Sequence, residues 1–543
     1  MTAATGFAGW IDRNILELGR EMRWSYAPPL MVYLAAGIQG LTAVVAQFYV
    51  KEELGLTAAF LAGLGFWATV PWFLKMPLGH LVDIIWRWKA ALVFLGAGLI
   101  AASLMIMYFL IGYPGPMRAI LPAETWFIIS VVLAPVGYVV QDVVADAMTV
   151  EAVPSVDDAG QPLAPATLRL MHTTMQTLGR VAIVGGFVVV SLVNIRMFSG
   201  IGQMTKAQKD TIYTDLHLIA LAIPVISVLG VVLGALSMRR RAARLRAGGM
   251  SAGAVHATVY AQEEKTEPSW LILGGGLGFA VFTVAVGIAK VPLGKEIIFV
   301  GSMAIVIFLM GRLMKALPRQ QMLMLIGTAV IIFIFRATPH AGPGVGWFEI
   351  DQLGFDQQFM PIRFLFVGIF ALAGMFIFRR FMADRSIAYL IVFLTVVVTV
   401  MALPNLGLYY GIHEWTAAHT GGVVDARFIA LADAAVESPF SQIAMIPMLA
   451  WIANNAPANL KATFFAIMAS FTNLALSASD LGAKYLNEIF TITRLTKDKA
   501  GTVKTPADYG EMGLLLIAVL VIGFVVPVLA VVLIQRSRWR TTQ

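Results

Sequence analysis

The feature that most constrains the fold of this chain is a series of long apolar runs. A helix needs about 20 apolar residues to cross the hydrocarbon core of a membrane. Because the runs are continuous, they disfavour a membrane barrel, whose strands alternate apolar and polar residues. The sequence therefore predicts an all-α polytopic membrane protein. The fourteen predicted spans are residues 28–50, 57–80, 90–112, 124–148, 168–193, 213–237, 270–290, 296–314, 321–338, 358–378, 386–410, 425–452, 460–490 and 511–535.

Composition narrows the class of protein further. Hydrophobic residues make up 59% of the chain and charged residues 13%, whereas soluble domains are about 45–50% apolar and about 25% charged. The chain has no cysteine, which excludes disulfides, thiolate catalysis and cysteine-ligated zinc. It also has no phosphate-binding loop of the GxxxxGK[ST] type and no compact histidine ligand set. We therefore expect no catalytic residues, no metal, no cofactor and no nucleic-acid partner.

The spans divide the chain into five predicted regions. Residues 1–27 form an amphipathic segment suited to the membrane interface. Residues 28–237 form a first bundle of six helices, and the basic, polar segment 238–268 connects it to the rest. A plan of two six-helix bundles leaves two spans over, so residues 269–316 are interpreted as two inserted helices and 317–543 as the second bundle. The apolar inserted helices 270–314 offer a surface for a protein partner.

Lysine and arginine predict the orientation. With the N-terminus inside, the inner segments hold about twice as many of these residues as the outer segments. This bias predicts that both termini lie in the cytoplasm, and the composition fits a bacterial inner membrane. The arginine cluster in MRRRAARLRAGG at the start of 238–268 is suited to the headgroups of anionic membrane lipids.

Charged residues inside the spans are candidates for function, because charge in a bilayer is costly. Asp142 and Asp146 are four residues apart, so both carboxylates lie on one face of the fourth span. Two close carboxylates repel one another when both are ionised, which favours uptake of a proton by one of them. The pair is therefore a candidate for proton coupling.

The same spacing recurs elsewhere. Gln176 and Arg180 share a face of the fifth span, as Asp433 and Glu437 do in 425–452. Asp480 and Lys484 have the spacing of a structural ion pair. The three patterns predict a polar cavity with supporting ion pairs.

A possible conformational latch follows the second span. Gly79 and Asp83 are followed by Arg87 and Lys89. A glycine permits close helix contact, and an aspartate can accept hydrogen bonds from basic residues or from a helix N-terminus. Such a group can hold one conformation and release another.

Several segments together resemble the folate-biopterin transporter family of the major facilitator superfamily. They are Gly37-Ile-Gln39-Gly40, VPWFLKMPLGHLVD with Lys75, Gln141-Asp142-Val-Val-Ala-Asp146-Ala147, Phe335-Arg336-Ala-Thr-Pro339, Ala456-Pro457, and Ala462-Thr463 with Asn473. The resemblance covers nearly all of the chain outside 269–316.

This resemblance implies two six-helix bundles, alternating access, and transport of folates, pterins or similar organic anions. By analogy, spans one, four, seven and ten line a central cavity. Candidate substrate-binding residues are then Gln39, Gln47, Lys75, Gln176, Arg180, Arg336 and Glu437. Proton coupling rests on the acidic residues alone, and its candidates are Asp142, Asp146 and Asp433. Lys75 and Arg180 could attract a carboxylate on the substrate.

Two other functions remain open at this point. The Gln-Asp…Asp-Ala pattern also resembles permeases for muropeptides and for acyl-nucleotides. Alternatively, the chain could be a membrane-complex assembly factor that does not transport and that docks through its inserted helices. Charges facing a central cavity favour transport, whereas charges facing neighbouring helices in a closed core favour assembly.

Overall fold

The computed structural model describes most of the chain. The described residues are 19–20, 22–43, 45–46, 68, 71–72, 75–153, 163–259, 266–289, 291–314, 319–342, 344–356, 358–378, 381, 385–440, 446, 461–493, 496–497 and 503–541. The predicted interfacial segment 1–27 and the predicted span 57–80 lie largely outside them.

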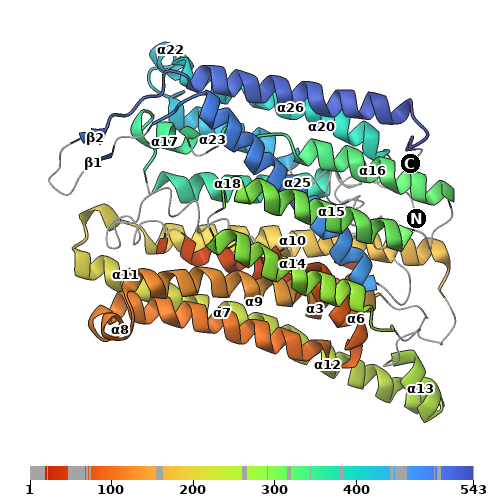
Figure 1. Cartoon of the computed structure of the whole chain (residues 1–543). Coiled ribbons are helices and arrows are strands. Elements are labelled where there is room, and N and C mark those ends of the chain that lie inside the picture. Colours follow the sequence, from red (N-terminus) through yellow and green to blue (C-terminus); the bar gives the residue numbers. More distant parts are fainter. Residues whose placement is uncertain are drawn as a thin grey trace, which may run out of the picture. The chain divides into compact units, whose positions relative to one another are not determined.

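The helices belong to two compact units (Figure 1). Unit 1 comprises Met1–Val291 with Leu449–Ser470, and unit 2 comprises Pro292–Met448 with Phe471–Gln543. The boundary falls inside the predicted insertion, so α14 (Trp270–Ile288) belongs to unit 1 and α15 (Gly294–Met314) to unit 2. Helix α25 (Lys461–Ile489) begins in unit 1 and continues in unit 2.

Unit 1 is built from long helices joined by short turns. Its other elements are η2 (Trp24–Tyr26), α3 (Ala27–Ile38), η3 (Gln39–Thr42), α6 (Lys75–Ile84), η5 (Trp86–Trp88), α7 (Lys89–Gly112), α8 (Pro114–Ile120), α9 (Ala123–Glu151), α10 (Pro165–Met197), η6 (Ile201–Gln203), α11 (Lys206–Ala220), α12 (Ala222–Ala247) and α13 (Ala252–Val259).

Unit 2 contains shorter helices and one small sheet. Its elements besides α15 and the end of α25 are α16 (Arg319–Arg336), α17 (Gly344–Asp351), α18 (Phe359–Ile377), α20 (Ile387–Met401), α21 (Leu403–Tyr409), α22 (Ile412–His419), α23 (Ala426–Glu437), η7 (Ser438–Phe440), β1 (Thr496–Lys497), β2 (Val503–Thr505) and α26 (Met512–Gln535). The antiparallel strands pair Thr496 with Thr505 and Lys497 with Val503. These two short strands lie in a segment too polar to be a span, and the other described elements are helical, as the all-α prediction requires.

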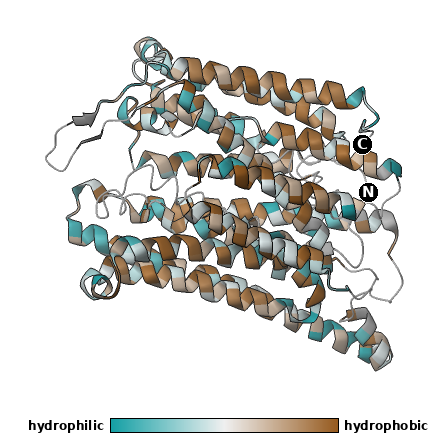
Figure 2. Ribbon diagram, viewed as in Figure 1, coloured by the Kyte–Doolittle hydropathy of each residue, from teal (hydrophilic) through white to brown (hydrophobic). Residues whose placement is uncertain are grey.

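Nine helical stretches among the described residues are long and apolar enough to cross a membrane. They are Trp86–Gly112, Ala123–Glu151, Thr174–Gln203, Lys206–Ala247, Trp270–Gly287, Gly294–Arg312, Phe359–Ile377, Ile387–Tyr409 and Met512–Gln535. Each matches a predicted span. Figure 2 shows that α7 and α26 are hydrophobic over most of their length, with hydrophilic residues gathered towards helix ends.

The predicted linker 238–268 is helical over much of its length. Helix α12 continues past the predicted span to Ala247, and α13 follows within the linker. Arginine, alanine and leucine are good helix formers, so the basic run extends the helix although it is too charged to remain in hydrocarbon.

Small residues allow the helices of unit 1 to pack closely. A Cβ atom added to Gly96 of α7 would lie 2.6 Å from the carbonyl oxygen of Gly137 of α9, and the reverse distance is the same. Further along this pair of helices, Ser103 and Ser130 each donate a hydrogen bond to the other's backbone carbonyl. Small residues and paired hydroxyls are typical of helix contacts in membranes, where the hydrophobic effect contributes little.

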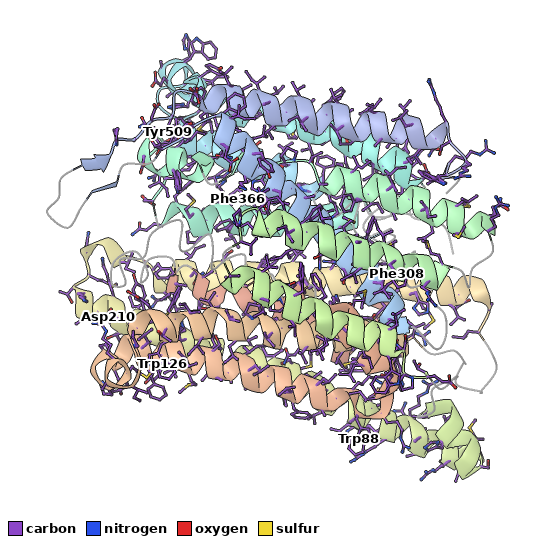
Figure 3. The ribbon with its side chains drawn as sticks, in the orientation of Figure 1. Trp88, Trp126, Asp210, Phe308, Phe366 and Tyr509 are labelled. Carbon is purple, nitrogen blue, oxygen red and sulfur yellow. The ribbon has the colours of Figure 1, made fainter. Side chains whose placement is uncertain are left out.

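Tryptophans mark opposite ends of this pair of helices. Trp88 precedes α7, and Trp126 lies in the first turn of α9, near the other end of α7 (Figure 3). The Trp126 indole donates a hydrogen bond to the carbonyl of Met117 at 2.9 Å. Tryptophan is enriched at both membrane–water interfaces, so the two positions fit a membrane-crossing helical hairpin.

Candidate functional site

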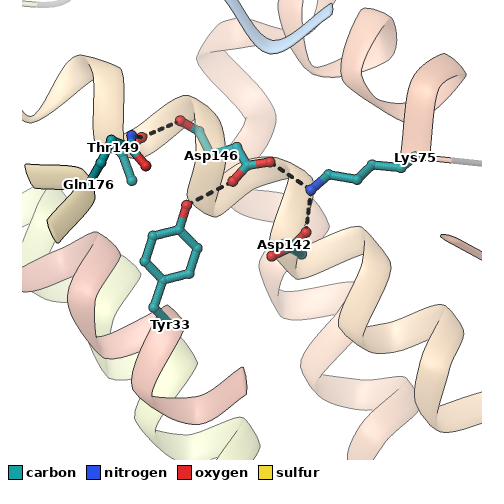
Figure 4. Close-up of polar contacts among 6 residues, drawn as sticks. All are labelled: Tyr33, Lys75, Asp142, Asp146, Thr149 and Gln176. Carbon is teal, nitrogen blue, oxygen red and sulfur yellow. Dashed lines mark hydrogen bonds and ion pairs between the residues drawn. The ribbon is translucent and has the colours of Figure 1, made fainter. Parts of the chain in front are cut away.

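A buried charge cluster connects α6 and α9 in unit 1. Lys75 Nζ, at the start of α6, lies 2.5 Å from Asp142 Oδ2 and 2.7 Å from Asp146 Oδ2 (Figure 4). The three side chains are only 7%, 16% and 12% exposed, respectively. Burial of ions is costly unless they are paired, and here one ammonium group serves two carboxylates. The three charges leave the cluster with one net negative charge.

Helical geometry accounts for the positions of the two aspartates relative to each other. Asp142 and Asp146 lie one turn apart on α9, so their carboxylates point to the same side. The interaction with Lys75, 67 residues away from Asp142, depends on the packing of α6 against α9. The sequence analysis assigned Lys75 to the substrate and did not identify it as the partner of both aspartates.

Two neutral side chains donate hydrogen bonds to Asp146, and a third donates to one of these two (Figure 4). The Tyr33 hydroxyl of α3 donates a hydrogen bond to Asp146 Oδ1 at 2.7 Å. The Thr149 hydroxyl donates to the Asp146 carbonyl at 2.7 Å, and the Gln176 amide of α10 donates to Thr149 Oγ1 at 3.1 Å. These contacts link α3 to the Asp146 carboxylate, and α10 through Thr149 to the Asp146 backbone carbonyl.

The sequence analysis missed Tyr33 and Thr149. A tyrosine in an apolar span buries its ring readily and needs a partner for its hydroxyl, which is the one signal in the sequence that could have singled out Tyr33. Nothing in the sequence distinguishes Thr149 from the other threonines of the spans.

Arg180 supplies a second positive charge on α10, one turn after Gln176. Its side chain is half-buried, and the preceding residue, Gly179, lies against the Tyr33 ring. Within the described part of the chain, Arg180 has no acidic partner at ion-pair distance. Together with Lys75, Asp142 and Asp146 it brings the formal charge of the region to zero.

Unit 2 contains a separate polar group. Arg363 of α18 pairs with Glu349 of α17 at 2.7 Å. The Asn405 amide donates to Asp433 Oδ2 at 3.0 Å, whereas no donor among the described residues reaches Asp433 Oδ1, although the side chain is buried. Glu437, one turn further along α23, is exposed.

The other predicted site residues lie elsewhere. Gln39 is exposed in η3, and Arg336 is the half-buried last residue of α16 in unit 2. Gln47 lies outside the described residues. Among the described residues of unit 1, Gln39 makes no contact with the cluster around Lys75.

The predicted latch residues have different partners. Asp83 accepts hydrogen bonds from the backbone nitrogen and the hydroxyl of Thr463 at 2.8 and 2.7 Å, near the start of α25. Lys89 pairs with Glu151 at 3.0 Å and lies over the Trp86 ring. Gly79 is buried and Arg87 is exposed.

The predicted pair Asp480–Lys484 is replaced by other contacts. Lys484 pairs with Glu296 of α15 at 2.8 Å, and Asp480 pairs with His340 at 3.0 Å. Both partners come from other parts of the chain. Lys484 also pairs within α25, but with Glu488 at 3.7 Å and not with Asp480.

Comparisons with known proteins agree with this architecture. A model of the BT1 family matches residues 36–540. The folate-biopterin transporter of Synechocystis sp. is 21% identical over 467 residues, which cover 85% of this chain and 74% of that relative.

Solved structures show the same fold. A POT family transporter in complex with 5-aminolevulinic acid superimposes with a TM-score of 0.55 at 11% identity, covering 96% of each chain. The proton:xylose symporter XylE, of the major facilitator superfamily, superimposes with a TM-score of 0.52 at 13% identity, covering 97% of this chain and 96% of XylE. The resemblance expected from the sequence motifs is thus confirmed. The chain belongs to the BT1 family of folate-biopterin transporters and is an integral membrane transporter with a major-facilitator fold, not an enzyme.

Proposed function

We propose that this transporter carries a folate, a pterin or a similar organic anion by alternating access, coupled to protons. The observation that carries the proposal is the position of Lys75 between Asp142 and Asp146. A buried lysine is a suitable partner for a carboxylate of the cargo. In the described conformation, however, two carboxylates of the protein already occupy it.

Proton binding resolves this competition. When Asp142 or Asp146 takes up a proton, it loses its charge and its attraction for Lys75 weakens. The ammonium group can then pair with an anionic cargo. Release of the proton restores the aspartate, which displaces the anion. Each anion therefore requires a proton at the same site.

Charge balance supports the same stoichiometry. Lys75, Arg180, Asp142 and Asp146 have a formal sum of zero. A monoanion entering this buried region adds one negative charge, and one proton cancels it. Electrostatic interactions are strong where water is excluded, so the neutral combination of anion and proton is favoured over either alone.

The remaining candidates are assigned to cargo recognition and coupling. Gln39, Gln47 and Gln176 are proposed to hydrogen-bond the cargo, and Arg336 and Glu437 are proposed as further substrate-binding residues. Asp433 is proposed as a further proton carrier. The relative from Synechocystis sp., a folate-biopterin transporter, supports this class of cargo.

We also propose fourteen spans, arranged as two six-helix bundles with α14 and α15 inserted. Both termini then lie in the cytoplasm, in a bacterial inner membrane. The outer face of α14 is strongly apolar, since Leu277 and Val281 are 67% and 62% exposed. This face is available to lipid chains and is the surface that a protein partner would use.

Uptake by proteoliposomes tests the function. We expect labelled folate, an anion, to accumulate when an inward proton gradient is imposed, and uptake of labelled biopterin is measured beside it as the cargo without a carboxylate. Asp142→Asn and Asp146→Asn should lose gradient-driven accumulation but retain counterflow exchange. Unchanged accumulation in both variants would remove the coupling role, and no uptake by folded protein would favour a muropeptide, acyl-nucleotide or assembly role.

A lysine variant tests recognition of the anion. Lys75→Gln should lose affinity for folate, which carries carboxylates, more than for biopterin, which carries none. Arg196→Gln is the matched control, because it removes one exposed positive charge from the last turn of α10. An equal loss for both compounds in Lys75→Gln would contradict the proposed contact.

A further inference from the structure

Besides Lys75, the short helix α6 contains three other residues that contact neighbouring elements. Lys75 begins it, Pro77 contacts α14, and His80 and Asp83 lie in its second half. The elements that pack against α6 therefore affect the positions of both Lys75 and Asp83. Helix α14, the first of the two helices predicted as an insertion, is one of these neighbours.

His80 connects α14 to the start of α25. Its side chain is 1% exposed. The backbone nitrogen of Ser269, immediately before α14, lies 2.8 Å from His80 Nε2. His80 Nδ1 lies 3.3 Å from the hydroxyl oxygen of Thr463, which is fully buried.

The hydrogen-bond partners of His80 determine which of its ring nitrogens carries a proton. A backbone N–H can only donate, so Nε2 must accept and carries no proton. The Thr463 hydroxyl donates to Asp83, so its oxygen must accept from His80 Nδ1–H. The imidazole is therefore neutral, with its proton on Nδ1. A continuous series of hydrogen bonds runs from Ser269 through His80 and Thr463 to Asp83.

Helices α14 and α6 make a second close contact, between Gly276 and Pro77. A Cβ atom added to Gly276 would lie 2.5 Å from both Cβ and Cγ of Pro77. By contrast, an added Cβ at Gly274, Gly275 or Gly278 meets nothing within 4 Å. Of the four glycines in GGGLG, only Gly276 is therefore needed for this close approach.

We infer that His80 is a positioning residue through which α14 restrains the contact between Asp83 of α6 and the start of α25. The inference rests on the proposed alternating-access cycle, in which that contact must open and close. It gives α14 a role: opening the Asp83–Thr463 contact also disturbs a buried hydrogen bond to the start of α14. A helix that only faced lipid would have no such effect.

Ser269 provides a matched pair of variants. Ser269→Pro removes the backbone donor, and it keeps the α14 helix bonds because Ser269 is the N-cap residue, with φ of −90°. Ser269→Ala keeps the donor and removes only a hydroxyl that makes no capping bond. The comparison therefore isolates the hydrogen bond to His80.

Cysteine labelling measures the effect without any substrate. The chain has no cysteine, so Ala466→Cys provides one reporter on α25, at a position 1% exposed. Ala145→Cys, fully buried in α9, is the control for general loosening. We expect Ser269→Pro to raise the maleimide labelling rate at 466 roughly fivefold, as expected for loss of one net hydrogen bond. The labelling rate at 466 should not change in Ser269→Ala. The labelling rate at 145 should not change in Ser269→Pro.

A second pair of variants, at Gly276 and Gly278, tests the same inference if Ser269→Pro does not fold. Gly276→Ala should push α14 from Pro77 and raise labelling at 466, whereas Gly278→Ala should not. Equal rates for both members of a pair, or equal increases at 466 and 145, would overturn the inference. Because labelling needs no cargo, this result is independent of whether folate or biopterin is transported.

Discussion

Tyr33 supplies a neutral donor to a cluster that is otherwise made of full charges. Its hydroxyl contacts Asp146, and its ring lies against the position of Gly179. A buried hydrogen bond to a charged group contributes about 1.5–3 kcal/mol. Tyr33 therefore stabilises the described arrangement of Lys75, Asp142 and Asp146.

The variant Tyr33→Phe should lower thermal stability by an amount in this range of about 1.5–3 kcal/mol. Tyr138→Phe is the control, because Tyr138 of α9 loses the same hydroxyl without losing a hydrogen bond to a described residue. Unfolding of both purified variants in detergent, followed by tryptophan fluorescence, checks the difference. Equal midpoints would show that the hydrogen bond contributes nothing measurable.

Asp433 presents the opposite case, a buried carboxylate with one oxygen lacking a donor among the described residues. A group buried without its hydrogen bond costs about 1–3 kcal/mol. Asp433→Asn removes the charge and should raise the unfolding midpoint, while Glu437→Gln, at an exposed position, should leave it unchanged. A lower midpoint in Asp433→Asn would mean that the carboxylate is stabilised by contacts beyond those described.

At the scale of elements, backbone contacts between helices explain which glycines matter. A Cβ atom on Gly186 of α10 would lie 2.6 Å from Gly37 Cα of α3, whereas one on the adjacent Gly185 meets nothing within 4 Å. The two glycines are neighbours in the same helix, so only the packing distinguishes them.

Gly186→Ala should therefore destabilise the protein by about 1–3 kcal/mol, the usual effect of overpacking a tight contact. Gly185→Ala should leave stability unchanged or raise it by about 0.5–1 kcal/mol, because alanine favours the helix. The two unfolding midpoints can be compared directly. A destabilised Gly185→Ala with an unaffected Gly186→Ala would contradict the α3–α10 contact.

At the scale of the whole molecule, the fourteen proposed spans make a topological prediction. Ala247 at the end of α12 should face the cytoplasm, and Ala418 in α22 should face the outside; both are exposed. In intact cells, an impermeant maleimide should label Ala418→Cys at once and Ala247→Cys only after lysis. Reversed labelling would place the termini outside, and equal labelling would contradict the count of spans.

The sequence by itself determined the features that depend on local chemistry. Long apolar runs predicted a helical membrane protein because any chain in hydrocarbon must satisfy its backbone hydrogen bonds within helices or closed barrels. Nine of the predicted spans are found among the described residues. The shared face of Asp142 and Asp146 followed from helical periodicity, which needs no tertiary information.

Only the tertiary structure decided which distant groups meet. It brought Lys75 and Tyr33 to the aspartates, joined Asp83 to Thr463, and gave Asp480 and Lys484 separate partners. These contacts depend on how helices separated by many residues pack, and a single sequence does not encode that packing in any local pattern. The residues of the site could therefore be found one by one, but their pairing, on which the proposed exchange of proton and anion depends, could not.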